Sequence, residues 1–191
     1  MVRRRAEPAV SHEATPPGWW RRLRRRLMPP PDAELVLAQL DRQLAVLEEA
    51  RAELEAGWVQ GGWWAVSSAD GSLRLVTGAA AAGGTPAHVD GACLVGALVR
   101  AGGPDAGRAV DAVYDALWAS RGQPDLPGPR PVPSPDVRLA RVRTLTRWND
   151  QAHRTQAEVL GLVDQAISAT VIDLMTAPRP ARAEPAGALR S

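Results

Sequence analysis

Several residue types are rare or absent in this chain of 191 residues, and each absence excludes something. There is no Phe and no Lys, and there is one Cys, one Tyr and one Asn. A single cysteine excludes an internal disulfide and is typical of a reducing compartment. No continuous run approaches the ~18 apolar residues of a membrane span. Acidic and proline residues follow the arginines at 3–5, where a signal peptide would be apolar. We therefore expect a cytoplasmic protein.

The basic residues are unusual in kind and in distribution. All 23 are Arg, which indicates a coding bias rather than selection for phosphate recognition. Residues 1–31 carry eight Arg and two Glu, whereas the remainder carries 15 Arg and 19 acidic residues. The pattern predicts a mildly acidic globular domain preceded by a basic arm.

The arm, residues 1–31, is rich in Arg, Pro and small residues, and we expect it to be disordered. Its segment 19–28 combines two Trp with five Arg, and the prolines at 29–31 end any helix there. The alternative is a short basic amphipathic segment that binds nucleic acid or an anionic membrane surface. The candidate binding residues are Trp19, Trp20, Arg21, Arg22, Arg24, Arg25 and Arg26. Residues 177–191 predict a second disordered tail.

Residues 32–176 have the pattern of a single, mostly α-helical compact domain of about five helices. Leucines spaced three and four residues apart between Leu37 and Leu54 predict a long first helix that ends before Gly57. An Asp70-Gly71 turn between two β-prone runs predicts an inserted β-hairpin over about 63–77. Capping residues predict where the helices begin. The predicted starts are Asp32, Asp90, Asp105, Ser134 and Thr155.

Cys93 is the first candidate for chemistry. It lies at the start of the second predicted helix, where backbone N–H groups lower the pKa of a thiol. His88 and His153 are the candidate partners, so a cysteine-dependent enzyme is one interpretation. The favoured interpretation is a buried structural cysteine. Cys93, Gly96 and Ala97 form a small-residue face, which we expect to let the fifth helix approach closely.

The turn Trp148-Asn149-Asp150 is the second candidate, as a binding site. In the structural interpretation, Asn149 adopts a left-handed conformation that closes the fourth helix, and Trp148 anchors the turn to the core. In the functional interpretation, Asn149 and Asp150 form an exposed pair that binds a ligand.

Metal and cofactor sites are not expected. A zinc site built from His88, Asp90 and Cys93, with His153, would lack the paired thiolates that make such spacing convincing. We therefore predict no metal and no cofactor.

Motifs spread along the chain resemble a known family. The residues that carry the resemblance are Gly57-Trp58-Val-Gln-Gly61, Gly91-Ala-Cys93-Leu-Val-Gly96-Ala97-Leu98, Leu145-Thr-Arg-Trp148-Asn149-Asp150, and Thr155-x-x-Glu158-Val159. Together they resemble the domain-of-unknown-function family six-one-nine-seven, a family of small actinobacterial and phage proteins, over about residues 34–170. The resemblance implies no activity. It does imply that Trp58, Cys93 and the Trp-Asn-Asp turn belong to one shared framework.

The functional expectation is therefore a small cytoplasmic accessory or regulatory protein that binds a macromolecular partner and catalyses no reaction.

The alternatives are an enzyme that uses Cys93 with His88 or His153, and a binder of nucleic acid or membrane surfaces through segment 19–28.

Overall fold

The computed structural model describes residues 33–77, 86–122 and 132–179. The predicted arm at 1–31, the cap residue Asp32 and most of the predicted C-terminal tail lie outside these residues. The candidate residues of segment 19–28 therefore remain a prediction. Within the described ranges, the expectation of a mostly helical domain with a small β-hairpin is confirmed.

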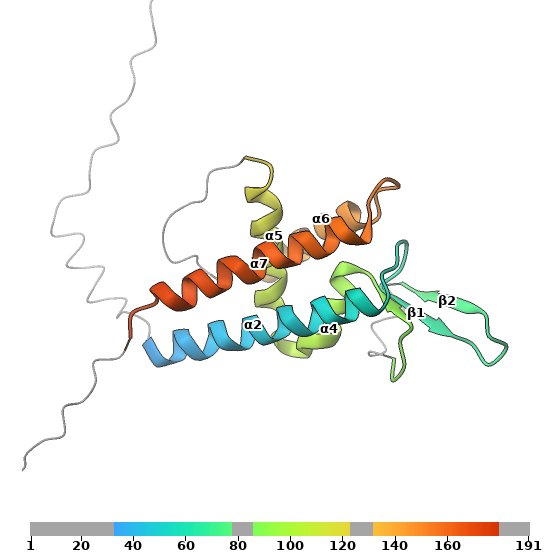
Figure 1. Ribbon diagram of the computed structural model, residues 1–191, viewed down its shortest axis with the longest axis horizontal. Coiled ribbons are helices and arrows are strands. Elements are labelled where there is room, and N and C mark those ends of the chain that lie inside the picture. Colours follow the sequence, from blue (N-terminus) through green and yellow to red (C-terminus); the bar gives the residue numbers. More distant parts are fainter. Residues whose placement is uncertain (1–32, 78–85, 123–131, 180–191) are drawn as a thin grey trace, which may run out of the picture.

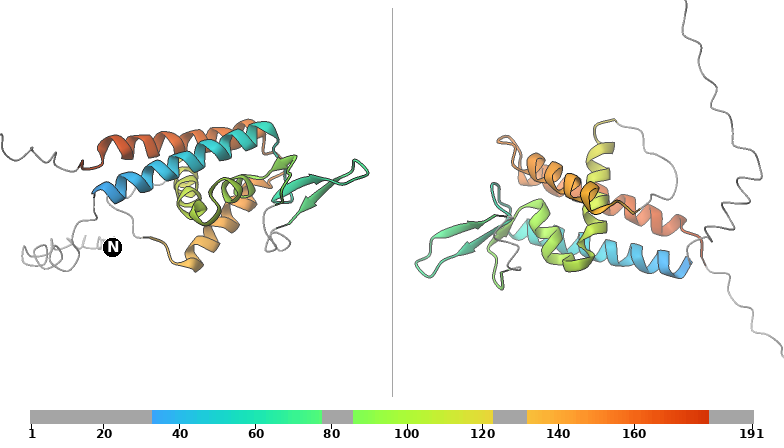
Figure 2. Two further views of the ribbon diagram at one scale, coloured as in Figure 1. Left: turned by 90° about the horizontal axis from the view of Figure 1, so that it is seen from below. Right: turned by 180° about the vertical axis from the view of Figure 1, so that it is seen from behind.

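Two long helices lie side by side and form one layer of the domain (Figures 1 and 2). They are α2 (Ala33–Ala56) and α7 (Gln156–Thr176). The short helix α4 (Leu94–Gly102) and the helix α5 (Ala106–Ala119) pack beneath them, joined by the 3-10 turn η1 (Gly103–Asp105). Helix α6 (Pro135–Asn149) packs against α4 and α5 on the side away from α2 and α7 (Figure 2).

A small antiparallel sheet extends from one end of this helical body (Figure 1). Its strands are β1 (Trp64–Ser67), β2 (Leu73–Val76) and β3 (Gly91–Ala92), in the order β2-β1-β3. The β1–β2 hairpin turns at Gly71, whose φ of 82° suits glycine. The predicted hairpin is therefore confirmed, and β3 is a strand that the sequence pattern did not indicate.

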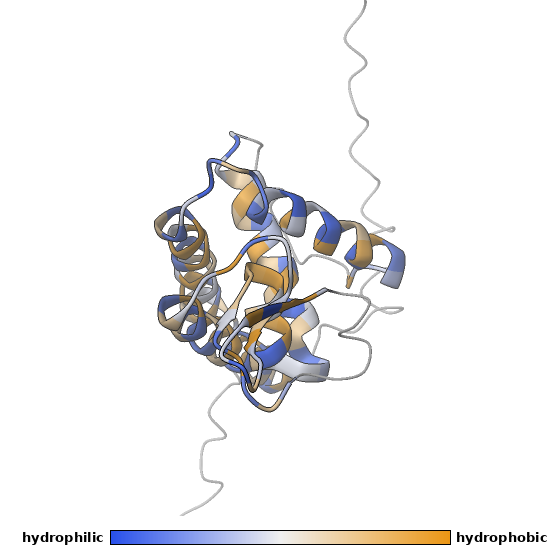
Figure 3. Ribbon diagram, turned by 90° about the vertical axis from the view of Figure 1, so that its right-hand side faces the viewer, coloured by the Kyte–Doolittle hydropathy of each residue, from blue (hydrophilic) through white to orange (hydrophobic). Residues whose placement is uncertain are grey.

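The core forms where the apolar stripes of the helices meet. Leu47 and Leu54 of α2 and Val159 and Val163 of α7 are fully buried. In helix α4, every residue from Leu94 to Leu98 is buried. Figure 3 shows hydrophobic segments concentrated at the centre of the helical body. Burial of this apolar surface is the main favourable term in folding.

Two predicted helix starts are confirmed by their hydrogen bonds. At the start of α7, the Thr155 side chain accepts from the Glu158 N–H, and the Glu158 carboxylate accepts from the Thr155 N–H. At the start of α6, the Ser134 hydroxyl accepts from the Val137 N–H. Both arrangements satisfy N–H groups that have no partner within the helix.

The predicted start at Asp90 is wrong, and the predicted start at Asp105 is right in position but lacks its side-chain cap. Helix α4 begins at Leu94 rather than after Asp90, because Gly91 and Ala92 pair with β1 as strand β3. The Asp90 carboxylate accepts the Ser67 N–H instead of capping the helix. Before α5, Asp105 makes no side-chain cap, and the 3-10 turn η1 precedes the helix.

The small-residue face of α4 receives a strand rather than a helix. A Cβ atom at Gly96 would overlap the Trp63 carbonyl oxygen and lie 3.0 Å from Trp64 Nε1. The Trp64 indole N–H donates to the Gly96 carbonyl over 3.0 Å. The fifth predicted helix, which begins after Thr155, is α7. The predicted packing of α4 on this helix is wrong, because α4 packs on α2, α5 and α6.

Among the described residues, α7 is one helix whose length and composition would allow it to cross a membrane. Its buried face carries Val159, Leu162, Val163 and Ala166, which pack in the core. Asp164 on the same helix forms an ion pair with Arg51 of α2. These contacts join one face of α7 to the rest of the helical body.

The close approach at Gly96 predicts a strong effect of one methyl group. We expect Gly96→Ala to lower the free energy of unfolding by about 2 kcal/mol or more, because the strand cannot move away without breaking core contacts. Urea denaturation measures the change.

Gly161→Ala is the matched control, since a Cβ built at this position in α7 meets no atom within 4 Å apart from the backbone of its own helix. Alanine there should raise stability by roughly 0.5 to 1 kcal/mol, because glycine is unfavourable within helices. Equal effects of the two substitutions would contradict the packing described for Gly96.

Candidate functional site

Cys93 is the N-cap residue of α4, and its thiol is fully buried. Its Sγ atom accepts the Gly96 N–H at 3.3 Å, and its own N–H donates to the Trp63 carbonyl at 2.9 Å. Burial raises the pKa of the Cys93 thiol to about 11, and the hydrogen bonds from the helix start offset this only in part. At neutral pH the side chain is therefore an uncharged thiol, which is a poor nucleophile.

The two candidate histidines lie in exposed positions away from the buried thiol. The His88 side chain is 80% exposed, and its Nε2 atom lies 3.2 Å from Asp90 Oδ1. His153 is exposed in the turn between α6 and α7. No hydrogen bond joins Cys93 to either histidine in the part of the chain that the structure describes.

No group of three or more His, Cys, Asp or Glu side chains within the described ranges is placed to hold a metal ion. The two nearest residues of the zinc set considered from the sequence, His88 and Asp90, contact each other, while the Cys93 thiol points to its own helix.

Asn149 lies at the centre of the most connected polar site among the described residues. It is fully buried, and its side-chain amide makes four hydrogen bonds. Oδ1 accepts the Trp58 indole N–H at 2.9 Å and the Leu94 backbone N–H at 3.2 Å. Nδ2 donates to the Val59 carbonyl at 3.2 Å and to Asp150 Oδ1 at 2.8 Å. These four bonds use the full capacity of an amide side chain.

A second set of contacts joins the same segments at the surface. The Gln60 side-chain amide donates to the Asn149 carbonyl at 2.7 Å and to the Gln151 carbonyl at 2.9 Å. The exposed carboxylate of Asp150 accepts the Gly61 N–H at 3.1 Å. The segment after α2 is thereby tied to the end of α6.

Trp148 anchors the turn, as the structural interpretation predicted, and only 8% of its surface is exposed. The guanidinium of Arg154 stacks over its ring at 4.0 Å and donates to its carbonyl. The same guanidinium pairs with Glu158 of the capping box. A cation over an indole ring is favourable, and here it links the turn to α7.

Two details of the predicted turn are wrong. No residue other than glycine has a positive φ in the described ranges, so Asn149 is helical and not left-handed. Asn149 and Asp150 are not an exposed pair, because only Asp150 reaches the surface. The Asn149 side chain points into the core, where it accepts the N–H groups of Trp58 and Leu94. Without Asn149 these buried donors would have no acceptor.

The framework that the resemblance implied is thus a physical network. Asn149 contacts Trp58 directly and reaches Leu94, the residue that follows Cys93. A family model described as a family of unknown function (DUF6197) matches residues 38–169. The chain belongs to this family. No curated protein and no solved structure matches the chain.

The DUF6197 match includes residues that the sequence reasoning did not select. Gln60 carried no signal beyond its place in the Trp58 motif. Leu73 and Leu75 of β2, which the sequence reasoning did not single out, are exposed. Three arginines far apart in the sequence, Arg42, Arg108 and Arg138, line one surface pocket. Their proximity depends on how the helices pack, which no local pattern encodes.

The saturated amide predicts a large cost for its removal. Asn149→Ala should lower the free energy of unfolding by about 3 kcal/mol, because it leaves the Trp58 and Leu94 N–H groups without an acceptor. Trp58→Phe should cost about 1 kcal/mol, since it removes one donor and leaves Leu94 bonded.

A double-mutant cycle separates this contact from general packing. In Trp58→Phe/Asn149→Ala, the loss in the free energy of unfolding should be smaller than the sum of the two single losses. The reason is that the Trp58 indole N–H, which Asn149→Ala alone leaves without an acceptor, is absent from the double mutant. Strict additivity in urea denaturation would contradict the direct bond.

The raised pKa of Cys93 predicts a stability loss at alkaline pH. Between the ordinary pKa of about 9 and the folded value of about 11, the unfolded chain releases the thiol proton and the folded chain keeps it. The free energy of unfolding should therefore fall as pH rises through this window, by up to about 1.4 kcal/mol per pH unit.

Cys93→Ser provides the control, because a hydroxyl caps the helix without titrating there. The pH-dependent difference between the two proteins isolates the thiol. Parallel profiles, or rapid labelling of the native Cys93 thiol at neutral pH, would contradict its burial.

Proposed function

We propose that this protein is a cytoplasmic accessory protein that binds a protein partner through its β-hairpin and catalyses no reaction. The observation that supports the proposal is the exposed outer strand β2, which projects from the helical body (Figure 1). The Cys93 thiol, kept as a buried free cysteine, suits a reducing compartment.

The hairpin exposes two large apolar side chains to solvent. Leu73 and Leu75 are 67% and 46% exposed, and alternate residues of a strand lie on one face. The next strand along, β1, buries Trp64 and Ala65. The sheet is therefore anchored at its base and carries an apolar face at its tip.

Strand β2 also occupies an edge of the described sheet, since β1 lies between β2 and β3. An edge strand presents unpaired backbone N–H and C=O groups to any extended segment that approaches. Addition of a partner strand to such an edge gives affinity through the backbone and specificity through the side chains. We infer that the partner supplies an extended apolar segment that pairs with β2.

The other interpretations gain less support from the geometry. An enzyme using Cys93 would need an accessible thiolate near His88 or His153, and the thiol is buried and protonated. The binding role of segment 19–28 concerns residues outside the described ranges. It remains a prediction that deletion of residues 1–31 and salt-dependent binding to nucleic acid and anionic vesicles can test.

Lysine substitutions on β2 test the proposal. We expect Leu73→Lys/Leu75→Lys to weaken partner binding at least about tenfold, because charged side chains on an edge strand oppose strand addition. The matched control is Leu139→Lys, since Leu139 on α6 is 48% exposed, close to the value for Leu75. Partners captured from host lysate by the wild-type protein are purified, and their affinities for all three proteins are measured by calorimetry.

The proposal requires a partner that the wild-type and Leu139→Lys proteins bind equally and the β2 variant binds weakly. Binding should also slow hydrogen exchange at the Leu73 or Leu75 backbone N–H. Equal affinity for the three proteins would overturn it. If sedimentation detects a homodimer that forms through β2, the partner is a second copy of this chain and not another protein.

A further inference from the structure

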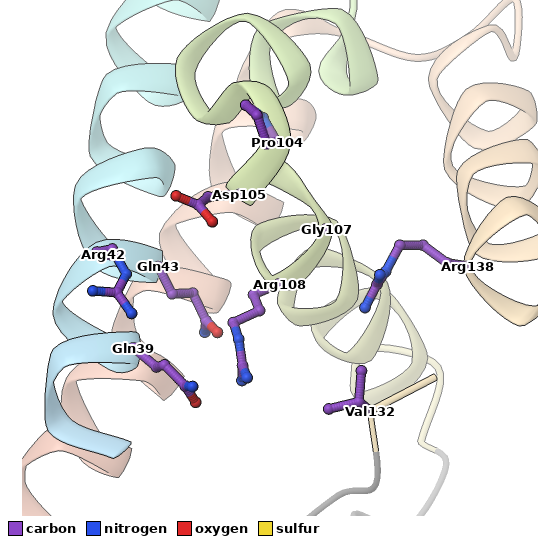
Figure 4. Close-up of a pocket in the computed structure, with 9 residues that line it drawn as sticks. All are labelled: Gln39, Arg42, Gln43, Pro104, Asp105, Gly107, Arg108, Val132 and Arg138. Carbon is purple, nitrogen blue, oxygen red and sulfur yellow. The ribbon is translucent and has the colours of Figure 1, made fainter. Parts of the chain in front are cut away.

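A small pocket opens where α2, α5 and α6 come together, and arginines from all three helices line it (Figure 4). Arg42 comes from α2, Arg108 from α5 and Arg138 from α6. Figure 4 shows Arg108 and the side chains of Gln39 and Gln43 pointing into the space between α2 and α5. The pocket shares no residue with the β1–β2 hairpin, so its role is independent of partner binding there.

Two of these arginines have no ionic partner among the described residues. Arg42 and Arg108 are exposed, and neither takes part in a hydrogen bond or ion pair within the described ranges. Elsewhere on the helical surface, Arg51, Arg100 and Arg141 all pair with acidic side chains. Two of the three guanidinium groups that line the pocket are therefore not neutralised by the described residues.

Arg138 lines the pocket from α6 and forms an ion pair with Asp111 of α5. Its Nη2 atom bonds Asp111 Oδ2 at 3.0 Å, while its Nε atom is buried without a hydrogen-bond partner. A buried donor without an acceptor is unfavourable. A small rotation of the guanidinium toward an acceptor in the pocket would relieve that cost.

Glycine at position 107 permits this arrangement. A Cβ atom there would lie 3.0 Å from the Cζ and Nε atoms of Arg138. Because Gly107 has no side chain, the guanidinium lies against the first turn of α5, where the helix dipole is positive. Asp105 is the acidic residue that lines the pocket, and its single charge leaves the arginines in excess.

We propose that this pocket binds a phosphate-type oxyanion, either free or as the phosphate group of a small molecule. Guanidinium groups form paired hydrogen bonds with phosphate oxygens, and groups from three directions suit a tetrahedral anion. All three arginines line the same pocket, and this shared position supports the site, whereas the use of Arg throughout the chain carries no information. A volume of about 270 Å³ lies just below the ~300–1,000 Å³ of typical ligand sites, which suits a small anion.

Calorimetric titration of the full chain with pyrophosphate and with inorganic phosphate tests the assignment, with acetate at equal ionic strength as the reference anion. We expect saturable pyrophosphate binding at one site. Arg42→Gln and Arg108→Gln should each weaken it about tenfold or more, because each removes charged hydrogen bonds to the anion. Neither side chain has a partner among the described residues, so thermal unfolding without ligand should be unchanged.

Arg143→Gln is the matched control, since Arg143 is an exposed arginine of α6 that does not line the pocket. Unchanged affinity in this variant, together with the losses in the other two, supports the assignment. Equal losses in all three variants would show a general charge effect and overturn it. Absence of saturable binding, or equal binding of acetate, would overturn it as well. Preference for inorganic phosphate over pyrophosphate would identify the free anion as the ligand.

Discussion

The side-chain amide of Asn149 is the interaction on which the rest of this structure depends. It joins three segments that are distant in the sequence: the chain after α2, the start of α4 and the end of α6. Each segment alone carries polar groups that burial would leave unpaired. An amide offers two acceptor and two donor positions on one short side chain, and all four are used here. Few other side chains could satisfy that set.

The network also explains the position of Cys93. Because the segment after α2 is fixed to Asn149, its backbone can pair with Ala92 through the Val59 N–H and the Gly57 carbonyl. That pairing, with β1 on the other side, holds β3 in place and sets the start of α4 at Leu94. The cysteine then lies beneath the Trp63 carbonyl, where burial keeps its thiol protonated. Cys93 lies at a helix start, where a nucleophile could be, but its buried side chain packs in the core.

Local patterns predicted the elements better than their contacts. The capping box at Thr155, the Ser134 cap and the Asp70-Gly71 turn act through neighbouring residues, so the sequence indicated them correctly. Strand β3 consists of two residues, which pair with β1 on one side and with the segment after α2 on the other. The close contact at Gly96 and the arginine pocket depend on packing between distant elements. Asn149 was selected from the sequence as part of the Trp-Asn-Asp turn, but its burial and its four partners required the structure.

Native-state hydrogen exchange tests the role of Asn149 most directly. The Trp58 indole N–H and the Leu94 backbone N–H can be followed individually by NMR in the unmodified protein. If Asn149 joins these segments, both protons should exchange about as slowly as the most protected amides of α7, since their release requires global unfolding. Exchange of either proton at the rate of an exposed turn would show that the site opens independently, and would contradict the account.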